Sequence, residues 1–461
     1  MTKLRKNIVN FLNYLFLMYL LIFSFFLGLS FYDSTTGLDY AKYSNAIDYY
    51  QGKSVELLDQ QGTIYFYTLS KLYSLNLHKS NLYDYDLISN NNIQLFNFFL
   101  FFVGLIGIYK LLKKYSFSNQ EIFLSFAITS FLPASYYMRL TMKPEIMAFT
   151  FLPWFMIYFD KFIKTKIYKY CLISSFLLSL MVTLKPSIGG MILLSFLYVY
   201  KNEVKNLIID LKFIITNIAN MFIFLFLNFK VTNIPFFSKP ISVDTQVLNR
   251  WDNTANLSFF YKIDLPKLIT DPYKFIHSDS FISITLLDTF SDYFGFYWNH
   301  QEKSNYLAFS RIEFTENFLI QTYLQQYLSI VLALSIYLLI FVLYFKKIPN
   351  YKILTFPIFG ILILIINSQG FPVKNFDPTT GDLFKVHYYS FLFTFTFIYL
   401  ITFLNKKMKN WKFLNLVLIP VFLITMGFPK ELSTDTQKAL IEKINISEIC
   451  FTINFLPNVS C

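Results

Sequence analysis

The side chains best suited to chemistry in this chain lie in short polar segments between long apolar runs. Two of them are carboxylates, Asp39 and Glu145, and each lies within a few residues of an apolar run. A carboxylate in such a place can remove the proton from an attacking hydroxyl group. Groups able to bind an anion occur in equivalent places, namely Arg139, Lys143, Lys185, Lys385 and His387. Such groups can hold a phosphate and stabilise it as a leaving group.

Each of these residues also has a structural interpretation that needs no ligand. Asp39 can cap a helix over residues 40–50. Pro144 suits the first turn of a helix, and Glu145 would then stabilise the positive end of that helix. A lysine between apolar runs, such as Lys185, must reach the headgroup region or pair with an anion. The sequence by itself leaves both interpretations open.

The apolar runs that position these residues are long enough to cross a bilayer. Hydrophobic residues make up 55% of the chain and charged residues 15%, against about 25% charged in a soluble domain. Only helices satisfy their own backbone groups in lipid one segment at a time. The sequence therefore predicts an all-α polytopic membrane protein with about eleven transmembrane helices. They are expected near 8–31, 93–112, 120–137, 145–163, 170–184, 187–200, 212–229, 322–345, 351–367, 387–404 and 412–427. The fifth and sixth could instead form one re-entrant hairpin.

The distribution of basic residues predicts which segments face the cytoplasm. With a cytoplasmic N-terminus, the inner segments are rich in lysine, as at 110–114 and 161–169. The short outer segments hold only Arg139, Lys143, Lys185, Lys374 and Lys385. This bias follows the positive-inside rule and explains the net charge of +12 without a nucleic-acid partner. The candidate residues then all lie on the outer face, and the first apolar run is expected to be a retained signal anchor.

The predicted domains follow from this topology. The boundaries are an N-terminal module of seven spans over 1–229 that includes a first outer loop at 32–92, a large outer loop at 230–321, a C-terminal module of four spans over 322–427, and an outer tail at 428–461. The first outer loop is expected to form two surface helices. One covers 40–50 and ends at Gly52, and the other is an amphipathic interfacial helix over 63–72. Cys450 and Cys461 share the tail, either as a disulfide or as two thiols.

Several function classes lose support because their motifs are missing. The chain has no GxGxxG, GxxxxGK[ST], HExxH, CxxC or GxSxG sequence, so nucleotide-driven transport and zinc proteolysis are not indicated. Charged residues are nearly absent within the predicted spans, which disfavours ion-coupled transport. The Asp84-Tyr85-Asp86 triplet has the spacing of a metal-binding pair but no nucleotide-binding fold around it. No cofactor is predicted, and a role for a divalent cation stays open.

The candidate residues resemble those of a known enzyme family. Asp39 with Tyr40 and Tyr43, the Lys143-Pro144-Glu145 run and the Leu184-Lys185-Pro186 stretch are similar to the GT-C superfamily of polyprenyl-phosphate-sugar-dependent glycosyltransferases. The resemblance covers about the first 200 residues. It implies an inverting transfer of a sugar from a polyprenyl-phosphate donor to a lipid, glycan or protein acceptor. The reaction would occur on the periplasmic face of a bacterial inner membrane.

The resemblance also implies roles for individual residues. Asp39 would be the general base on the acceptor hydroxyl, and Glu145 would position acceptor or donor or assist the base. The other expected contacts are with the substrates, and their residues are Tyr40, Tyr43, Arg139, Lys143, Lys185, Lys385 and His387.

Two other functions are compatible with the hydropathy pattern. A polysaccharide polymerase of the O-antigen type has a similar number of spans and a large outer loop. That loop should depend on arginines, yet residues 230–321 contain only Arg250 and Arg311. A non-enzymatic lipid or sugar exporter would need polar residues at mid-membrane depth, which the predicted spans lack. The glycosyltransferase is therefore the favoured expectation.

Overall fold

A computed structural model describes most of residues 46–75, 85–132, 142–207 and 210–235. Shorter described pieces lie within 8–26, 135–139, 258–290, 300–320, 323–345, 394–404 and 430–431. The predicted spans 351–367 and 412–427 and most of the tail lie outside the described residues.

The described chain is almost entirely helical, which confirms the predicted helical class. Its helices are α3 (Thr63–Leu75), α4 (Tyr85–Lys114), α5 (Asn119–Thr129), α7 (Glu145–Thr165), α8 (Tyr168–Val182), α9 (Pro186–Val199), α10 (Lys201–Leu207), α11 (Leu211–Thr232), α12 (Ser258–Tyr261), α13 (Leu265–Thr270), α14 (Phe281–Asp288) and α16 (Tyr323–Phe345). Four two-residue strands form two antiparallel pairs, β1 (His300–Gln301) with β2 (Glu313–Phe314) and β3 (Leu319–Ile320) with β4 (Lys430–Glu431).

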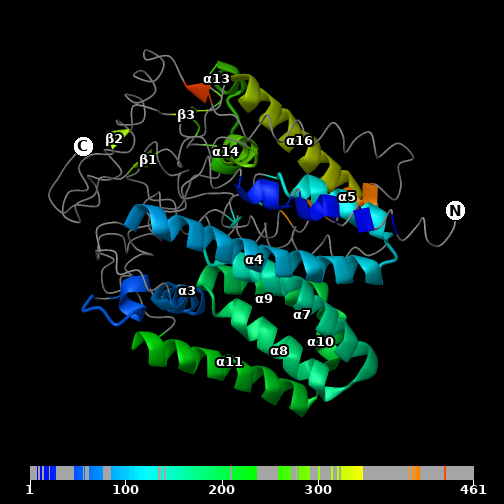
Figure 1. The fold of residues 1–461 in the computed structure, drawn as a ribbon. Helices are drawn as coiled ribbons and strands as arrows, with labels where there is room; N and C mark the ends of the chain where they lie inside the picture. The colour runs from blue at the N-terminus through cyan, green and yellow to red at the C-terminus, as the bar shows by residue number, and fades with distance from the viewer. Residues whose placement is uncertain are drawn as a thin grey trace.

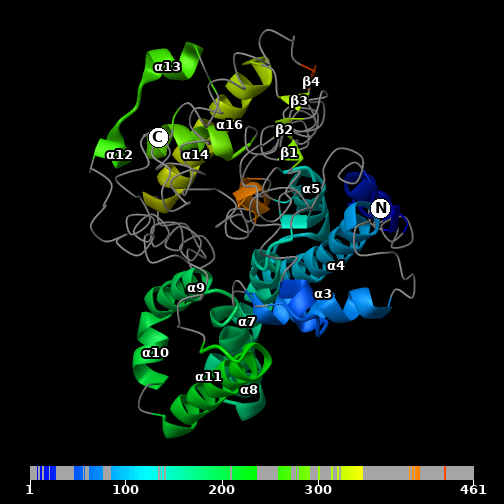
Figure 2. The ribbon, with the colours of Figure 1, turned by 90° about the vertical axis from the view of Figure 1, so that its left-hand side faces the viewer.

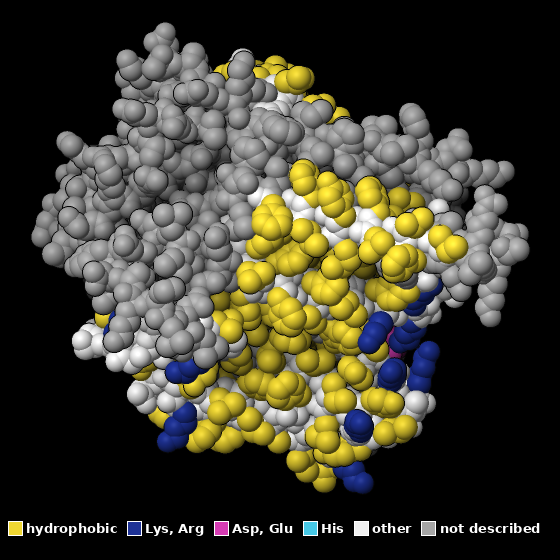
Figure 3. Space-filling model, viewed as in Figure 1, with side chains coloured by type: hydrophobic (Ala, Val, Ile, Leu, Met, Phe, Trp, Pro, Cys, Tyr) yellow, Lys and Arg dark blue, Asp and Glu magenta, His cyan; other side chains and the backbone are white. Residues whose placement is uncertain are grey.

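A bundle of long helices forms the best-described part of the molecule. Helix α7 packs between α4 and α8, and α8 in turn packs against α9 and α11 (Figure 1). Among the described residues, three helical segments are long and apolar enough to cross a membrane: Ile93–Lys114, Glu145–Thr165 and Leu211–Thr232. Hydrophobic side chains cover most of the described part of the face seen in Figure 3, and lysines gather toward the side where α4 ends. These features are those of a helical membrane protein, and the count of about eleven spans stays a prediction.

Helices α4 and α7 approach each other closely through two glycines. A Cβ atom added at Gly104 would lie 2.6 Å from the Phe149 ring, and one at Gly107 would lie 2.8 Å from Pro153 Cγ. The close approach lets Thr150 Oγ1 donate a hydrogen bond to the Leu100 carbonyl at 2.9 Å. Small residues commonly line the contacts between membrane helices because they let the two backbones approach closely. Apolar faces alone do not drive this association, since lipid solvates them as well as another helix does. The glycine pair thus fixes the register of α7.

Polar side chains, together with ring contacts of Phe213 and Phe224, attach helix α11 to its neighbours. Thr216 hydrogen-bonds through its hydroxyl to the Tyr168 hydroxyl at 2.8 Å, and its carbonyl accepts from Ser175 at 3.2 Å. Asn220 donates to Ser175 Oγ at 3.0 Å. Near the other end of the helix, Asn228 donates to Thr63 Oγ1 of α3 at 3.0 Å. Hydrogen bonds therefore locate α11 against both α8 and α3.

Helix α5 is shorter than the continuous span predicted over 120–137. It begins with a capping box between Ser118 and Glu121 and ends at Thr129, followed by a turn. Eleven residues rise only about 16 Å, too little to cross a bilayer. The Ser130 hydroxyl donates back to the Phe126 carbonyl, and Pro133 follows shortly in the sequence. Hydroxyl back-bonding and the nearby proline favour a break that the apolar composition hides.

Helices α8 and α9 are separate and joined by the turn Thr183–Lys185. Their 15 and 14 residues rise only about 21–22 Å each, so the choice between two short spans and a re-entrant hairpin stays open. A Cβ atom at Gly189 would overlap the Val182 carbonyl oxygen and lie 3.1 Å from its carbonyl carbon. The glycine therefore lets α9 start directly against the end of α8.

Replacing Gly189 with alanine is expected to destabilise the protein by about 1–3 kcal/mol, because the added methyl group meets backbone that has no room to move. The matched control is the adjacent Gly190, where an added Cβ meets nothing within 4 Å. Gly190→Ala should be neutral or stabilising by up to about 1 kcal/mol, because alanine is the better helix former. Thermal unfolding in one detergent measures both. Equal effects from the two substitutions would contradict the assigned close contact.

Within the predicted loop 32–92, the described residues form helices where the sequence predicts them. Residues 46–50 are helical, and Gly52 follows with φ +85°, as expected at the end of a helix. The expected start of that helix, residues 40–45, lies outside the described part. The second predicted helix is α3, which lies across the bundle end where α4 and α7 begin (Figures 1 and 2). Its crosswise direction is that of an interfacial helix.

Candidate functional site

Three chain segments meet at the end of the bundle that α3 crosses: the start of α3, the start of α7 and the α8–α9 turn. The backbone N–H of Gly62 donates to the Leu184 carbonyl at 2.6 Å. Gly62 has φ +69°, and a Cβ atom there would lie 2.8 Å from the Phe66 ring and 3.0 Å from Pro144 Cβ. Only glycine fits both the backbone angle and the space. This meeting point is called the outer site below.

An ion pair joins α7 to the α8–α9 turn at the outer site. Lys185 Nζ lies 3.3 Å from Glu145 Oε1, and their side chains are 12% and 2% exposed. Glu145 is the first residue of α7, and Lys185 precedes α9 in an extended conformation. The expectation that a lysine between apolar runs pairs with an anion is thus met by a protein carboxylate. Removing either partner would leave a buried charge uncompensated, which is strongly unfavourable.

The second oxygen of the Glu145 carboxylate is the atom of the site that most clearly indicates a ligand. Glu145 Oε2 is buried and accepts no hydrogen bond from the described part of the chain. Glu145 is the first residue of α7, so its carboxylate lies at the positive end of the helix dipole. A buried hydrogen-bond acceptor without a donor is energetically unfavourable, and a hydroxyl group from a ligand would supply that donor. The unmet oxygen therefore marks Glu145 as a candidate contact for a hydroxyl group.

Lys143 is a buried cation on the same segment. It lies two residues before Glu145, and little of its surface is exposed. Buried lysines are found paired or at functional positions, because an isolated ammonium is expensive to bury. The start of α7 and the α8–α9 turn thus each bring a lysine to the outer site. Ammonium groups of this kind also bind phosphate.

Arg139, also expected to bind phosphate, directs its guanidinium into the protein. Its Nη1 donates to Ser24 Oγ at 2.8 Å, its Nη2 to the Ser130 carbonyl at 2.6 Å and its Nε to the Ser135 carbonyl at 3.1 Å. The guanidinium carbon also lies 4.9 Å from the centre of the Phe101 ring. These contacts hold the segment before α7 against the first helix and α4. A phosphate-binding role for Arg139 stays a prediction.

Helix α3 is held over the outer site by polar side chains that the sequence analysis did not single out. The Tyr65 hydroxyl donates to Asn97 Oδ1 at 2.7 Å, and Asn228 donates to Thr63. The Tyr49 hydroxyl donates to the Thr232 carbonyl at 3.3 Å. Asparagines within apolar runs were the available signal, because such amides need partners in lipid.

The remaining predicted site residues lie outside the described part of the chain: Asp39, Tyr40, Tyr43, Lys385 and His387. Whether they approach Glu145 is therefore left as a prediction. The Asp84-Tyr85-Asp86 side chains are also not described. Within the described ranges, no group of three or more His, Cys, Asp or Glu residues could hold a metal ion.

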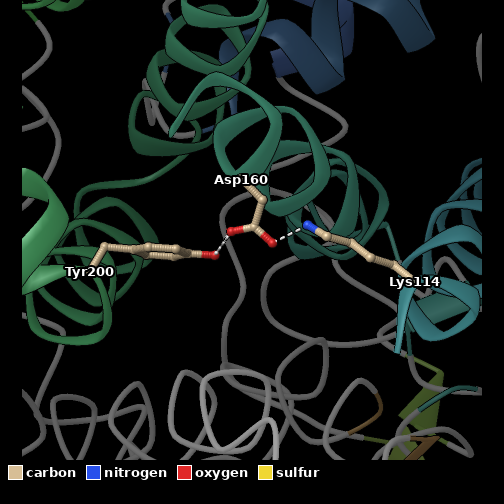
Figure 4. A network of polar contacts seen from close by, with 3 residues as sticks. All are labelled: Lys114, Asp160 and Tyr200. Atoms are coloured by element: carbon tan, nitrogen blue, oxygen red, sulfur yellow. Dashed lines mark hydrogen bonds and ion pairs between the residues drawn. The ribbon is translucent and has the colours of Figure 1, made fainter. Parts of the chain in front are cut away.

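The opposite end of the bundle carries a second polar network. Asp160 of α7 forms an ion pair with Lys114 at the end of α4. The Tyr200 hydroxyl, from the junction of α9 and α10, donates to Asp160 Oδ1 at 3.2 Å (Figure 4). Tyr200 is fully buried, so the network ties three helices together. A carboxylate of α7 therefore forms an ion pair with a neighbouring segment at each end of the bundle.

The outer site brings together a carboxylate oxygen without a described hydrogen-bond partner, the buried Lys143, the partly buried Lys185 and the start of helix α3. Such groups suit a ligand that combines hydroxyls with a phosphate and reaches the site from the bilayer. Comparison of the chain with models of known families, with curated proteins and with solved structures gives no match. The assignment of a function therefore depends on these residues.

Proposed function

We propose that the chain is an integral-membrane glycosyltransferase that moves a sugar from a polyprenyl-phosphate donor to a lipid, glycan or protein acceptor. The observation that supports this most is the buried Glu145 carboxylate, which pairs with Lys185 through one oxygen and leaves the other without a described partner. A sugar carries hydroxyl donors for that oxygen, and a lipid phosphate carries the charge that buried lysines attract. A polyprenyl-phosphate sugar carries both features in one molecule.

The reaction would be a single displacement with inversion. The Asp39 carboxylate takes the proton from the acceptor hydroxyl as its oxygen attacks the anomeric carbon. The bond from that carbon to the phosphate oxygen breaks, and both bonding electrons leave with the polyprenyl phosphate. Lys143 stabilises the charge that develops on this leaving group. Glu145, fixed by Lys185, accepts a hydrogen bond from a substrate hydroxyl and orients the reacting pair.

The place of the site favours a lipid-linked donor over a nucleotide sugar. Under the predicted topology the outer site lies on the periplasmic face, whereas nucleotide sugars are made in the cytoplasm. Helix α3 lies crosswise at this end of the bundle, and a helix in that direction is compatible with a place at the membrane interface, where lipid phosphates lie. A bacterial inner membrane supplies polyprenyl-phosphate sugars at that surface.

The function is tested by incubating the purified protein with radiolabelled polyprenyl-phosphate sugars and a panel of acceptors. Unaltered protein is expected to move the label from the lipid to an acceptor. Glu145→Gln should lower transfer by about 10–100-fold, because hydrogen bonds to charged groups contribute about 1.5–3 kcal/mol.

Asp48→Asn is the matched control for this experiment. Asp48 is another carboxylate of the outer side, paired with Lys53 at 2.6 Å but 20% exposed, and its loss should leave transfer unchanged. Thermal unfolding of both variants separates loss of activity from loss of structure. Failure of every donor to release label, or full activity of Glu145→Gln, would refute the proposal.

A further inference from the structure

The end of the bundle opposite the outer site is strongly basic. It comprises the end of α4 and the α7–α8 connection, residues 109–114 and 158–170, and is called the basic end below. Its lysines are Lys110, Lys113, Lys114, Lys161, Lys164, Lys166 and Lys169, against the single acid Asp160. Figure 3 shows lysine and arginine side chains collected along this border of the apolar surface. The charge is therefore concentrated where the apolar belt ends.

The only acid within the basic end is already neutralised by the protein. Asp160 is held by the ion pair with Lys114 and by the hydrogen bond from Tyr200 (Figure 4). Since this carboxylate is used internally, it does not compensate the six other lysines of these two segments. The surface they share has a positive potential that favours an anion.

Several of these lysines lie over aromatic rings. Lys110 Nζ lies 4.5 Å from the centre of the Trp154 ring, and Lys161 Nζ lies 5.5 Å from the rings of both Tyr158 and Tyr170. Trp and Tyr concentrate at the headgroup level of a bilayer, and lysine stems extend toward it along apolar surface. Rings of this kind beside Lys110 and Lys161 favour a position of these ammonium groups near the headgroups of a bilayer.

We propose that the basic end binds the phosphate headgroup of an anionic phospholipid in the cytoplasmic leaflet, chiefly through Lys110, Lys113 and Lys161. The evidence is the charge of this surface, its neutralised acid and the aromatic rings beside Lys110 and Lys161. Each lysine near an anionic bilayer surface strengthens association by about fivefold. The proposal does not depend on the reaction at the outer site.

The experiment measures retention of phosphatidylglycerol and phosphatidylcholine by the purified full-length protein, using native mass spectrometry. The unaltered protein is expected to retain phosphatidylglycerol in preference, and rising NaCl should weaken that retention. The triple variant Lys110→Gln, Lys113→Gln, Lys161→Gln should bind phosphatidylglycerol about a hundredfold more weakly. Melting in lipid-free detergent checks that the variant is folded. If the triple variant is not folded, two other measurements test the proposal. One is the preference of the unaltered protein for phosphatidylglycerol over phosphatidylcholine, and the other is the retention of phosphatidylglycerol by the single Lys110→Gln variant.

The matched control neutralises three lysines near the other end of the bundle: Lys53→Gln, Lys71→Gln, Lys230→Gln. Lys71 and Lys230 also lie over aromatic rings, at 5.0 Å from Tyr67 and 5.6 Å from Phe226, so the control removes equal charge in a similar setting. Its retention of phosphatidylglycerol should equal that of the unaltered protein. Equal retention of the two lipids, equal loss in both triple variants, or full displacement by millimolar inorganic phosphate would overturn the proposal.

Discussion

Replacing Asp39 with asparagine is expected to lower sugar transfer by about 10²–10⁴-fold, the usual contribution of a general base. Asparagine keeps the size of the side chain and removes its ability to accept the proton of the acceptor hydroxyl. Donor binding should be nearly unchanged, because the residues proposed to hold the donor phosphate are lysines elsewhere on the chain. The measurement is the single-turnover rate with a saturating radiolabelled polyprenyl-phosphate sugar, so that loss of binding is not mistaken for loss of chemistry.

Two controls show whether the loss of transfer activity is specific to Asp39. Asp48→Asn removes a carboxylate nine residues further along the same outer loop, one that is occupied by Lys53, and should transfer sugar at the normal rate. Raising the pH should not restore the Asp39→Asn enzyme, since the amide has no proton to lose in that range. A variant that retains full activity would remove Asp39 from the mechanism and leave Glu145 as the remaining candidate base.

Replacing Lys185 with alanine is expected to destabilise the protein by about 3–5 kcal/mol, because Glu145 would be left as a buried charge without its partner. The Glu145 side chain is only 2% exposed, so water cannot readily take the place of the ammonium group. Transfer activity should fall with stability, because the carboxylate loses the contact that fixes its direction. Unfolding in mixed micelles of a mild detergent and dodecyl sulfate measures the loss.

A double variant shows whether the charge is the cause. In Glu145→Gln with Lys185→Met, both charges are gone and the volumes are nearly kept, so most of the lost stability should return. Lys53→Ala breaks an ion pair whose side chains are 31% and 20% exposed and should cost at most about 1 kcal/mol. A Lys185→Ala loss no larger than that of Lys53→Ala would mean that the pair carries little stability.

The sequence predicted the helices of the bundle well, because long apolar runs have few other solutions in a membrane. Helix α7 starts at Glu145 as expected, and α8, α9 and α11 lie within about two residues of the predicted spans at most ends. The predicted helix boundaries were wrong where polar residues continue a helix beyond its apolar run. Helix α4 starts at Tyr85 and runs through three asparagines, since a helix need not end where the apolar run ends.

The site was predictable in its residue types and less so in its pairings. Pattern alone indicated that Glu145 and Lys185 lie at one depth, but it did not say that they contact each other. That contact needs the α8–α9 turn to reach the start of α7, which depends on Gly62 and Gly189 and their close packing. Arg139 shows the reverse case, because its type suggested a ligand contact while its donors are taken by Ser24 and two carbonyl groups.

The way α11 is attached has a consequence for the handling of this protein. Much of its apolar surface faces away from the described chain, including Leu211, Ile215, Ile218, Phe222, Ile223 and Phe226. In a bilayer, hydrocarbon covers that surface as well as another helix would, so the amide and hydroxyl contacts with α8 and α3 decide where α11 sits. Short-chain detergents admit water, which competes for those contacts. Extraction into such micelles would therefore loosen α11 before the glycine-packed α4–α7 pair, and with it the support that Asn228 gives to the interfacial helix.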